Sequence, residues 1–217
     1  MMDFRQKREL VRGLLTYVVC EEERRRAHAL YERYLDDAMA MELLFTHYSM
    51  PPGREDAGID DLRLLGHRQG LFLIAALAGD EGHLYLLSSE GAEYLGTLGE
   101  TDPDAELIAH FGPELPQRLR GDHCLLPAYQ APGKDSATCP ACHCRSGELH
   151  ELGCPVEVCP WCGGQLVRCA CRFEQLGCDD IGDEELEELE RLLEAQGRVP
   201  FSAEQRPGFL APDLDAT

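Results

Sequence analysis

Apolar residues recur at helical spacing through the first quarter of the chain. From Glu21 to Tyr48 they fall every three or four positions among good helix formers, which predicts one long helix that ends at Pro51 and Pro52. Residues 10–19 carry apolar positions at four-residue spacing and indicate another helical face, although the β-branched second half of this run fits a short strand equally well.

The pattern then changes to short apolar runs separated by polar segments that contain glycine. These runs occupy residues 62–66, 71–78, 83–88 and 94–98. They predict an antiparallel meander of three or four strands against which the long helix packs. Thr101-Asp102-Pro103 then starts a short helix whose buried side is Leu107, Ile108 and Phe111. The expected fold class is therefore α+β.

Cysteines dominate the next stretch, because eight of the eleven lie between residues 139 and 171. Two of its units read Cys-x-x-Cys, a spacing that lets one tight turn aim both sulfurs at a single ion. Each unit supplies half of a tetrahedral site, and the nearest second halves complete two sites in series. The predicted ligand sets are Cys139, Cys142, His150 and Cys154, and then Cys159, Cys162, Cys169 and Cys171. Closed shells of thiolate and imidazole favour two structural zinc ions.

Other interpretations of the same cysteines stay open at this point. Cys144 could replace His150 or Cys154 as a ligand, and Cys139 and Cys142 could instead pair with the last two cysteines across the module. Iron is an alternative to zinc, because the Cys-Pro-x-Cys-Gly form is also that of a rubredoxin knuckle. Disulfides are disfavoured, because one- and two-residue gaps make poor bridges.

The string from His150 to Gln165, HELGCPVEVCPWCGGQ, followed by Cys169-Ala-Cys171, resembles a zinc-ribbon-type module of small bacterial and phage proteins. The downstream segment from Gly197 to Phe201 is similar to one found in the same group. The resemblance covers roughly residues 139–202. It implies metal binding but no reaction, since the group carries no assigned activity, and it leaves the amino-terminal domain unidentified.

Beyond the cysteines, acids crowd the start of an apolar stripe that begins at Leu186 and stops at Gly197, which predicts an acidic amphipathic helix. The expected organisation is an α+β domain at 1–111, a Pro-rich linker at 112–138, a double zinc-knuckle module at 139–178, this helix and its extension at 179–202, and a mobile tail at 203–217.

Charge narrows the choice of partners. Forty acidic residues against twenty basic ones give a formal net charge of −20, which repels phosphate and disfavours direct nucleic-acid binding. No apolar run is long enough for a membrane span. Arg12 interrupts the amino-terminal apolar run, and Val19 before Cys20 does not fit a lipoprotein cleavage site, so we expect a cytoplasmic protein.

Catalytic motifs are weak. Phosphate loops, nucleophile elbows and metalloprotease helices do not occur, and a hydrolase would need scattered residues to converge: His47, His67, Asp60 and Asp61. We therefore expect a non-enzymatic adaptor or regulator that binds a protein partner, one with a basic surface being the best match. A nucleic-acid-binding ribbon and an acidic mimic of nucleic acid are the alternatives.

Overall fold

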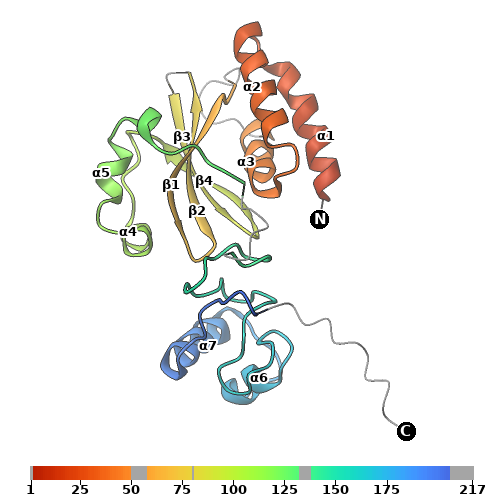
Figure 1. Cartoon of the computed structure of the whole chain (residues 1–217), viewed down its shortest axis with the longest axis vertical. Coiled ribbons are helices and arrows are strands. Elements are labelled where there is room, and N and C mark those ends of the chain that lie inside the picture. The colour runs from red at the N-terminus through yellow and green to blue at the C-terminus, as the bar shows by residue number, and fades with distance from the viewer. Residues whose placement is uncertain (1, 50–57, 80, 132–137, 206–217) are drawn as a thin grey trace. The chain divides into compact units, whose positions relative to one another are not determined.

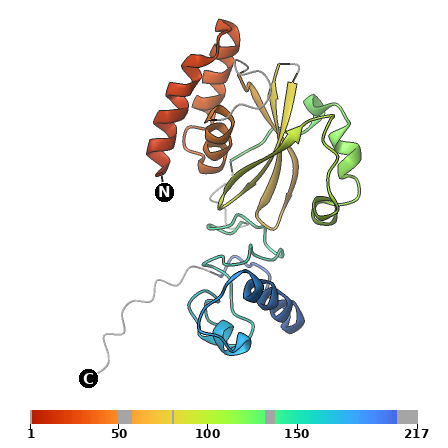
Figure 2. The same cartoon turned by 180° about the vertical axis from the view of Figure 1, so that it is seen from behind.

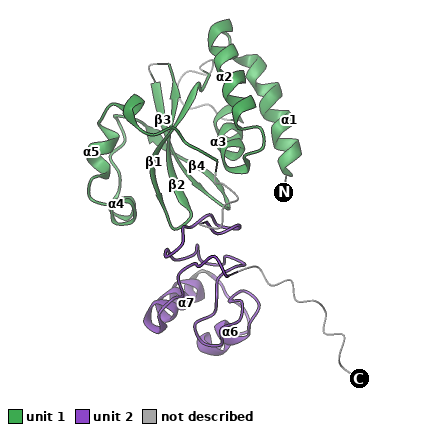
Figure 3. Cartoon of the chain, viewed as in Figure 1, with its two compact units in different colours: residues 1–133 green, residues 134–217 purple. Residues whose placement is uncertain are grey.

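The structure, a computed structural model, describes residues 2–49, 58–79, 81–131 and 138–205 of the 217-residue chain. The chain divides into two compact units, Met1–Gly133 and Lys134–Thr217, called unit 1 and unit 2 as in Figure 3. The predicted helix end at Pro51 and Pro52 lies outside the described residues, as do residues 206–217 of the predicted tail.

Unit 1 is built on a four-stranded antiparallel sheet in the order β1-β2-β3-β4 (Figure 1). The strands are β1 (Asp61–Arg68), β2 (Leu71–Ala78), β3 (Glu81–Ser88) and β4 (Gly91–Thr97). The first hairpin turns at Gln69 and Gly70, whose φ angles of 52° and 83° match the turn type that suits the twist of paired strands. The predicted α+β class and the antiparallel meander are confirmed.

Helices cover both faces of this sheet (Figures 1 and 2). One layer contains α1 (Phe4–Leu14), α2 (Glu21–Arg33) and α3 (Ala38–Ser49), and the other contains α4 (Ala105–Phe111) and α5 (Leu115–Leu119). β2 therefore buries both of its faces, with Phe72 and Ile74 in the core under α3 and with Leu73 and Ala75 in the core under α5. In the described parts of the chain, every helix is too short or too polar to cross a bilayer.

The prediction of one long helix between Glu21 and Tyr48 is wrong, because the chain breaks between α2 and α3. Tyr34 leaves helical geometry at φ −108° and ψ 22°, and its hydroxyl donates to the carbonyl of Tyr129 at 2.6 Å. Asp37 then starts α3 by accepting hydrogen bonds from the amides of Met39 and Ala40. Both helices pack on the same core, so the apolar stripe continues across the break.

Residues 112–131, which lie within the predicted linker, contribute to the core of unit 1. Leu115 and Leu119 of α5 are buried. Tyr129 is also buried, and its amide donates to the carbonyl of Leu62 at 2.8 Å. This segment therefore runs along the free edge of β1 and satisfies some of its backbone groups.

In its described part, unit 2 has little regular structure outside α6 (Cys171–Leu176) and α7 (Asp183–Gln196). α7 ends at Gly197 and buries Leu189 and Leu193 against Cys159 and Leu166. The remaining buried side chains of the unit are largely cysteines, so its core is organised around sulfur.

Candidate metal centres

The first Cys-x-x-Cys unit forms a tight backbone turn. The amide of Cys139 donates to the carbonyl of Cys144 at 2.8 Å, and the amide of His143 donates back to the carbonyl of Cys139 at 3.0 Å. His143 adopts a positive φ of 60°, which is uncommon outside glycine. The turn directs the side chains of Cys139 and Cys142 to the same side.

The second unit repeats this turn twenty residues later. The amide of Cys159 donates to the carbonyl of Gly164 at 2.7 Å, and the amide of Gly163 donates to the carbonyl of Cys159 at 2.9 Å. Gly163 has a φ of 74° and occupies the place of His143. Unit 2 therefore contains two copies of one local design.

The structure brings together the first predicted ligand set. Donor atoms of Cys139, Cys142, His150 and Cys154 all lie within 4.8 Å of one another, and all four residues are buried. The sulfurs of Cys139 and Cys154 are 3.7 Å apart, and Nδ1 of His150 is 3.5 Å from the sulfur of Cys142. This group could hold a metal ion through three sulfurs and one imidazole nitrogen.

The second predicted set also forms a single group. Donor atoms of Cys159, Cys162, Cys169 and Cys171 lie within 4.8 Å of one another. Cys159 is buried and Cys162 is exposed, so this group sits nearer the surface than the first one. The grouping follows the series arrangement and does not combine the first Cys-x-x-Cys unit with Cys169 and Cys171. None of the eleven cysteines, all in described parts of the chain, forms a disulfide.

The residues downstream of α7 hold His150 in place. Nε2 of His150 is 3.0 Å from Oε1 of Gln205, which fixes Nε2 as the protonated nitrogen and leaves Nδ1 free to bind a metal. The ring of Phe201 packs edge-on against the imidazole, with centroids 5.4 Å apart. A hydrogen bond to the second ring nitrogen, such as the one from His150 to Gln205, orients a metal-binding histidine.

A buried ion pair connects the same downstream segment to the chain between the two groups. Arg198 donates to the carboxylate of Glu157 at 2.8 Å and to the carbonyl of His150 at 2.7 Å. Glu157 is only 1% exposed. Burial raises the pKa of its carboxyl, and the adjacent guanidinium opposes that rise. Arg198 thereby fixes the backbone beside a donor of the first group.

Crowded thiols compete for protons in the first group. Cys142 lowers the pKa of the Cys139 thiol through a hydrogen bond, and Cys139 in turn raises the pKa of Cys144 and of Cys154. Burial opposes a charge on His150, but hydrogen bonds to Cys139 and Cys142 raise the pKa of its imidazole to about 10. A divalent cation removes this conflict, because every donor can then direct a lone pair at the metal.

The same competition marks the second group. The amide of Gly164 lowers the pKa of the Cys162 thiol, and Cys162 raises the pKa of Cys171 to about 12. Negative charge is thus favoured on Cys162 over Cys171 when these thiols meet without a cation.

Sequence reasoning did not assign roles to Glu157, Arg198, Phe201 or Gln205. The first three lie within the strings that carry the zinc-ribbon resemblance, so that resemblance was an available signal. Gln205 lies outside them, and no local pattern marks it.

The residues considered for a hydrolase do not form a comparable group in the described parts of the chain. His47 approaches the hydroxyl of Tyr85 at 2.9 Å, and His67 stacks on Phe72 with ring centroids 3.8 Å apart. Asp60 pairs with Arg26 at 3.5 Å, while Asp61 pairs with Arg63. Each of the four therefore has a structural partner of its own.

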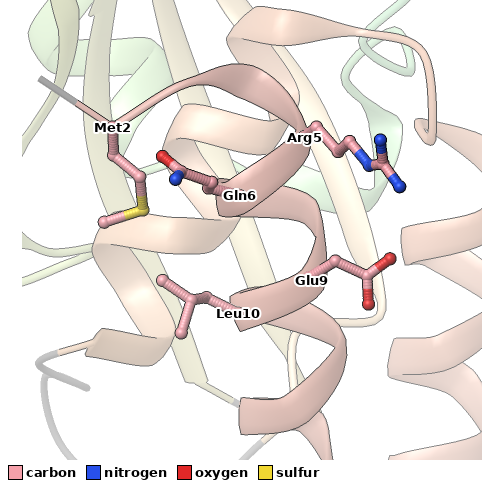
Figure 4. Close-up of a pocket in the computed structure, with 5 residues that line it drawn as sticks. All are labelled: Met2, Arg5, Gln6, Glu9 and Leu10. Carbon is pink, nitrogen blue, oxygen red and sulfur yellow. The ribbon is translucent and has the colours of Figure 1, made fainter.

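A surface pocket of about 500 Å³ lies on α1 of unit 1 (Figure 4). It is lined by Met2, Arg5, Gln6, Glu9 and Leu10. Gln6 is already engaged, since its side chain accepts from the amide of Asp3 in a capping box. The pocket therefore lies along one helix and brings together no set of catalytic groups.

Comparisons with family models, with curated proteins and with solved structures returned no significant match.

Proposed function

We propose that this chain is a non-enzymatic zinc-binding interaction protein, in which two zinc ions stabilise unit 2 and the metal-stabilised surface binds a protein partner. The observation that carries the proposal is the pair of four-donor groups in unit 2. Each group fills a tetrahedral shell with protein donors, which is typical of structural rather than catalytic zinc. Soft sulfur with imidazole suits zinc well, and four-sulfur coordination also leaves iron as an alternative.

The nature of the partner is inferred from charge. Glu184, Glu187, Glu190 and Glu194 lie exposed on α7, and Leu186, one turn before Glu190, is exposed as well. Acidic side chains around an apolar residue suit a basic protein surface, because opposite charges steer the encounter and the apolar contact is buried on binding. The same acids repel phosphate, so nucleic-acid binding is the weaker alternative.

The proposal is tested in two steps on the full chain. Elemental analysis with native mass measurement should give two zinc ions per chain; one metal per chain, or iron, would contradict the metal assignment. Anisotropy titrations with mixed-sequence duplex and single strands should show no sub-micromolar binding at physiological salt. Tight binding that falls steeply with added salt would instead make unit 2 a nucleic-acid reader.

The partner is tested separately by affinity capture followed by titration of the purified partner. Binding should weaken as salt rises, and a charge-reversed α7 with Glu187→Lys, Glu190→Lys and Glu194→Lys should lose it. Glu93→Lys, at an exposed position in unit 1, is the control and should leave binding unchanged. Equal binding by both variants would remove α7 from the proposed surface.

A further inference from the structure

The first metal group lies beside one more sulfur than a tetrahedral shell needs. Cys144 is fully buried, and its sulfur lies 3.6 Å from Nδ1 of His150. The sulfur of Cys142 lies 3.5 Å from the same nitrogen. Cys144 stands outside the set of four mutually close donors, and it adjoins the donor atom of the only histidine in that set.

The repeated turn explains why this side chain faces the metal group. Cys144 and Gly164 hold the same position, because each supplies the carbonyl that accepts from the first cysteine of its turn. A Cβ atom added to Gly164 would meet the sulfur of Cys162 at 3.5 Å, an ordinary contact distance. Any side chain at this position is thus directed toward the donors, and only the first turn places a sulfur there.

We propose that Cys144 is a reserve ligand of the first site, which takes the place of His150 when the imidazole leaves the metal. The inference rests on the proposed binding of zinc. In the exchange the bond from the metal to Nδ1 of His150 breaks and a bond to the sulfur of Cys144 forms. The thiol proton of Cys144 passes to Nδ1, so the positive imidazolium balances the negative charge that the fourth thiolate adds. No oxidation occurs.

The exchange couples the metal to the segment after α7. His150 is held through Nε2 by Gln205 and against the ring of Phe201, whereas the backbone hydrogen bonds that close the turn from Cys139 to Cys144 involve neither residue. Displacement of that segment would free the imidazole while the metal stays bound by four sulfurs. The second site has no equivalent, because Gly164 supplies no donor there.

Cobalt substitution in the full chain tests this, since cobalt occupies such sites and its thiolate charge-transfer absorption grows with the number of bound sulfurs. His150→Ala should retain two metal ions per chain and gain charge-transfer absorption. Cys144→Ser should retain two ions with an unchanged spectrum. The double variant should retain one. Cys20→Ser, an exposed thiol in unit 1, is the control.

The second site provides a matched gain-of-ligand test that leaves His150 untouched. Cys169 is the third donor of its group, as His150 is of the first. Cys169→Ser alone should lose one metal ion, and Gly164→Cys in that background should restore it. This variant does not depend on the folding of the first site.

Each outcome points to a different conclusion. Loss of one ion from His150→Ala, equal to the loss in the double variant, would overturn the reserve role, as would failure of Gly164→Cys to restore the second ion. Loss of an ion from Cys144→Ser alone would make Cys144 a permanent ligand and likewise overturn it. Fewer than two ions in the unmodified chain would instead refute the proposed zinc binding.

Discussion

The two units bury different kinds of atoms. Unit 1 encloses aliphatic and aromatic side chains on both faces of its sheet, including Leu43, Leu73 and Tyr85. Unit 2 buries cysteines, with a few apolar residues such as Val156, and has no sheet in its described part. A core of the first kind forms by removing apolar area from water, whereas a core of thiols needs a cation to satisfy its donors. The two units should therefore fail under different treatments.

The largest expected effect comes from removing the metal. A strong chelator should unfold residues 139–178 and leave the secondary structure of unit 1 largely intact, because metal-binding energy is the folding energy of such a segment, about 10–16 kcal/mol per structural zinc. Amide hydrogen exchange read by mass spectrometry checks this segment by segment. Unchanged protection of residues 139–178 after the metal has left would contradict it.

Breaking the buried ion pair between Arg198 and Glu157 should have the second-largest effect on stability. Arg198→Ala leaves the Glu157 carboxylate buried without its partner, and we expect unit 2 to lose about 3–5 kcal/mol of stability. Chemical unfolding followed through Trp161 of unit 2 measures the loss. Arg191→Ala is the matched control, because its pair with Glu188 is exposed and should contribute at most about 1 kcal/mol. Equal losses in the two variants would refute the role given to Arg198.

A truncation in the apolar core of unit 1 tests the same difference between the two units. Leu43→Ala should cost about 2–5 kcal/mol, because it leaves a cavity in a fully buried position of α3. The metal content should stay the same, since the eight donors of the two candidate groups all belong to unit 2. Thermal unfolding monitored by circular dichroism gives the stability, and elemental analysis gives the metal content. Leu125→Ala, at a position 83% exposed, should change stability by about 0.5 kcal/mol or less.

The smallest effect concerns pH. Burial lowers the pKa of His83 from 6.5, and neither of its ring nitrogens has a hydrogen-bond partner among the residues that the structure describes. The unfolded chain therefore binds a proton near pH 6.5, whereas the folded chain binds it only at a lower pH. The resulting destabilisation of unit 1 begins as pH falls through 6.5 and is complete below the lowered pKa of the folded state. Its slope is at most about 1.4 kcal/mol per pH unit.

His83→Phe should remove this part of the pH dependence. Denaturant unfolding of the two proteins at pH 7.5 and pH 5.5 isolates the contribution of His83, because other titrating groups are shared. Identical differences between the two pH values in both proteins would show that His83 titrates as it does in the unfolded chain.

Local patterns predicted what local forces determine. Short apolar runs with glycine turns indicated the meander, and Cys-x-x-Cys spacing indicated the two four-donor groups. The break at Tyr34 escaped detection because its cause is distant: the hydroxyl bonds to the carbonyl of Tyr129. The spacing could not rank His150 against Cys144 either, because that choice depends on backbone turns and on Gln205, fifty-five residues from His150.

The residues that hold the first group in place lie far along the chain from its donors, and this has a consequence for biosynthesis. The donors of the second group span only residues 159–171, so they can assemble soon after that stretch leaves the ribosome. The first group has its donors earlier but receives Arg198 and Gln205 last, across separations of forty-one and fifty-five residues. We therefore expect the nascent chain to complete the first centre after the second, in the reverse of their order along the sequence.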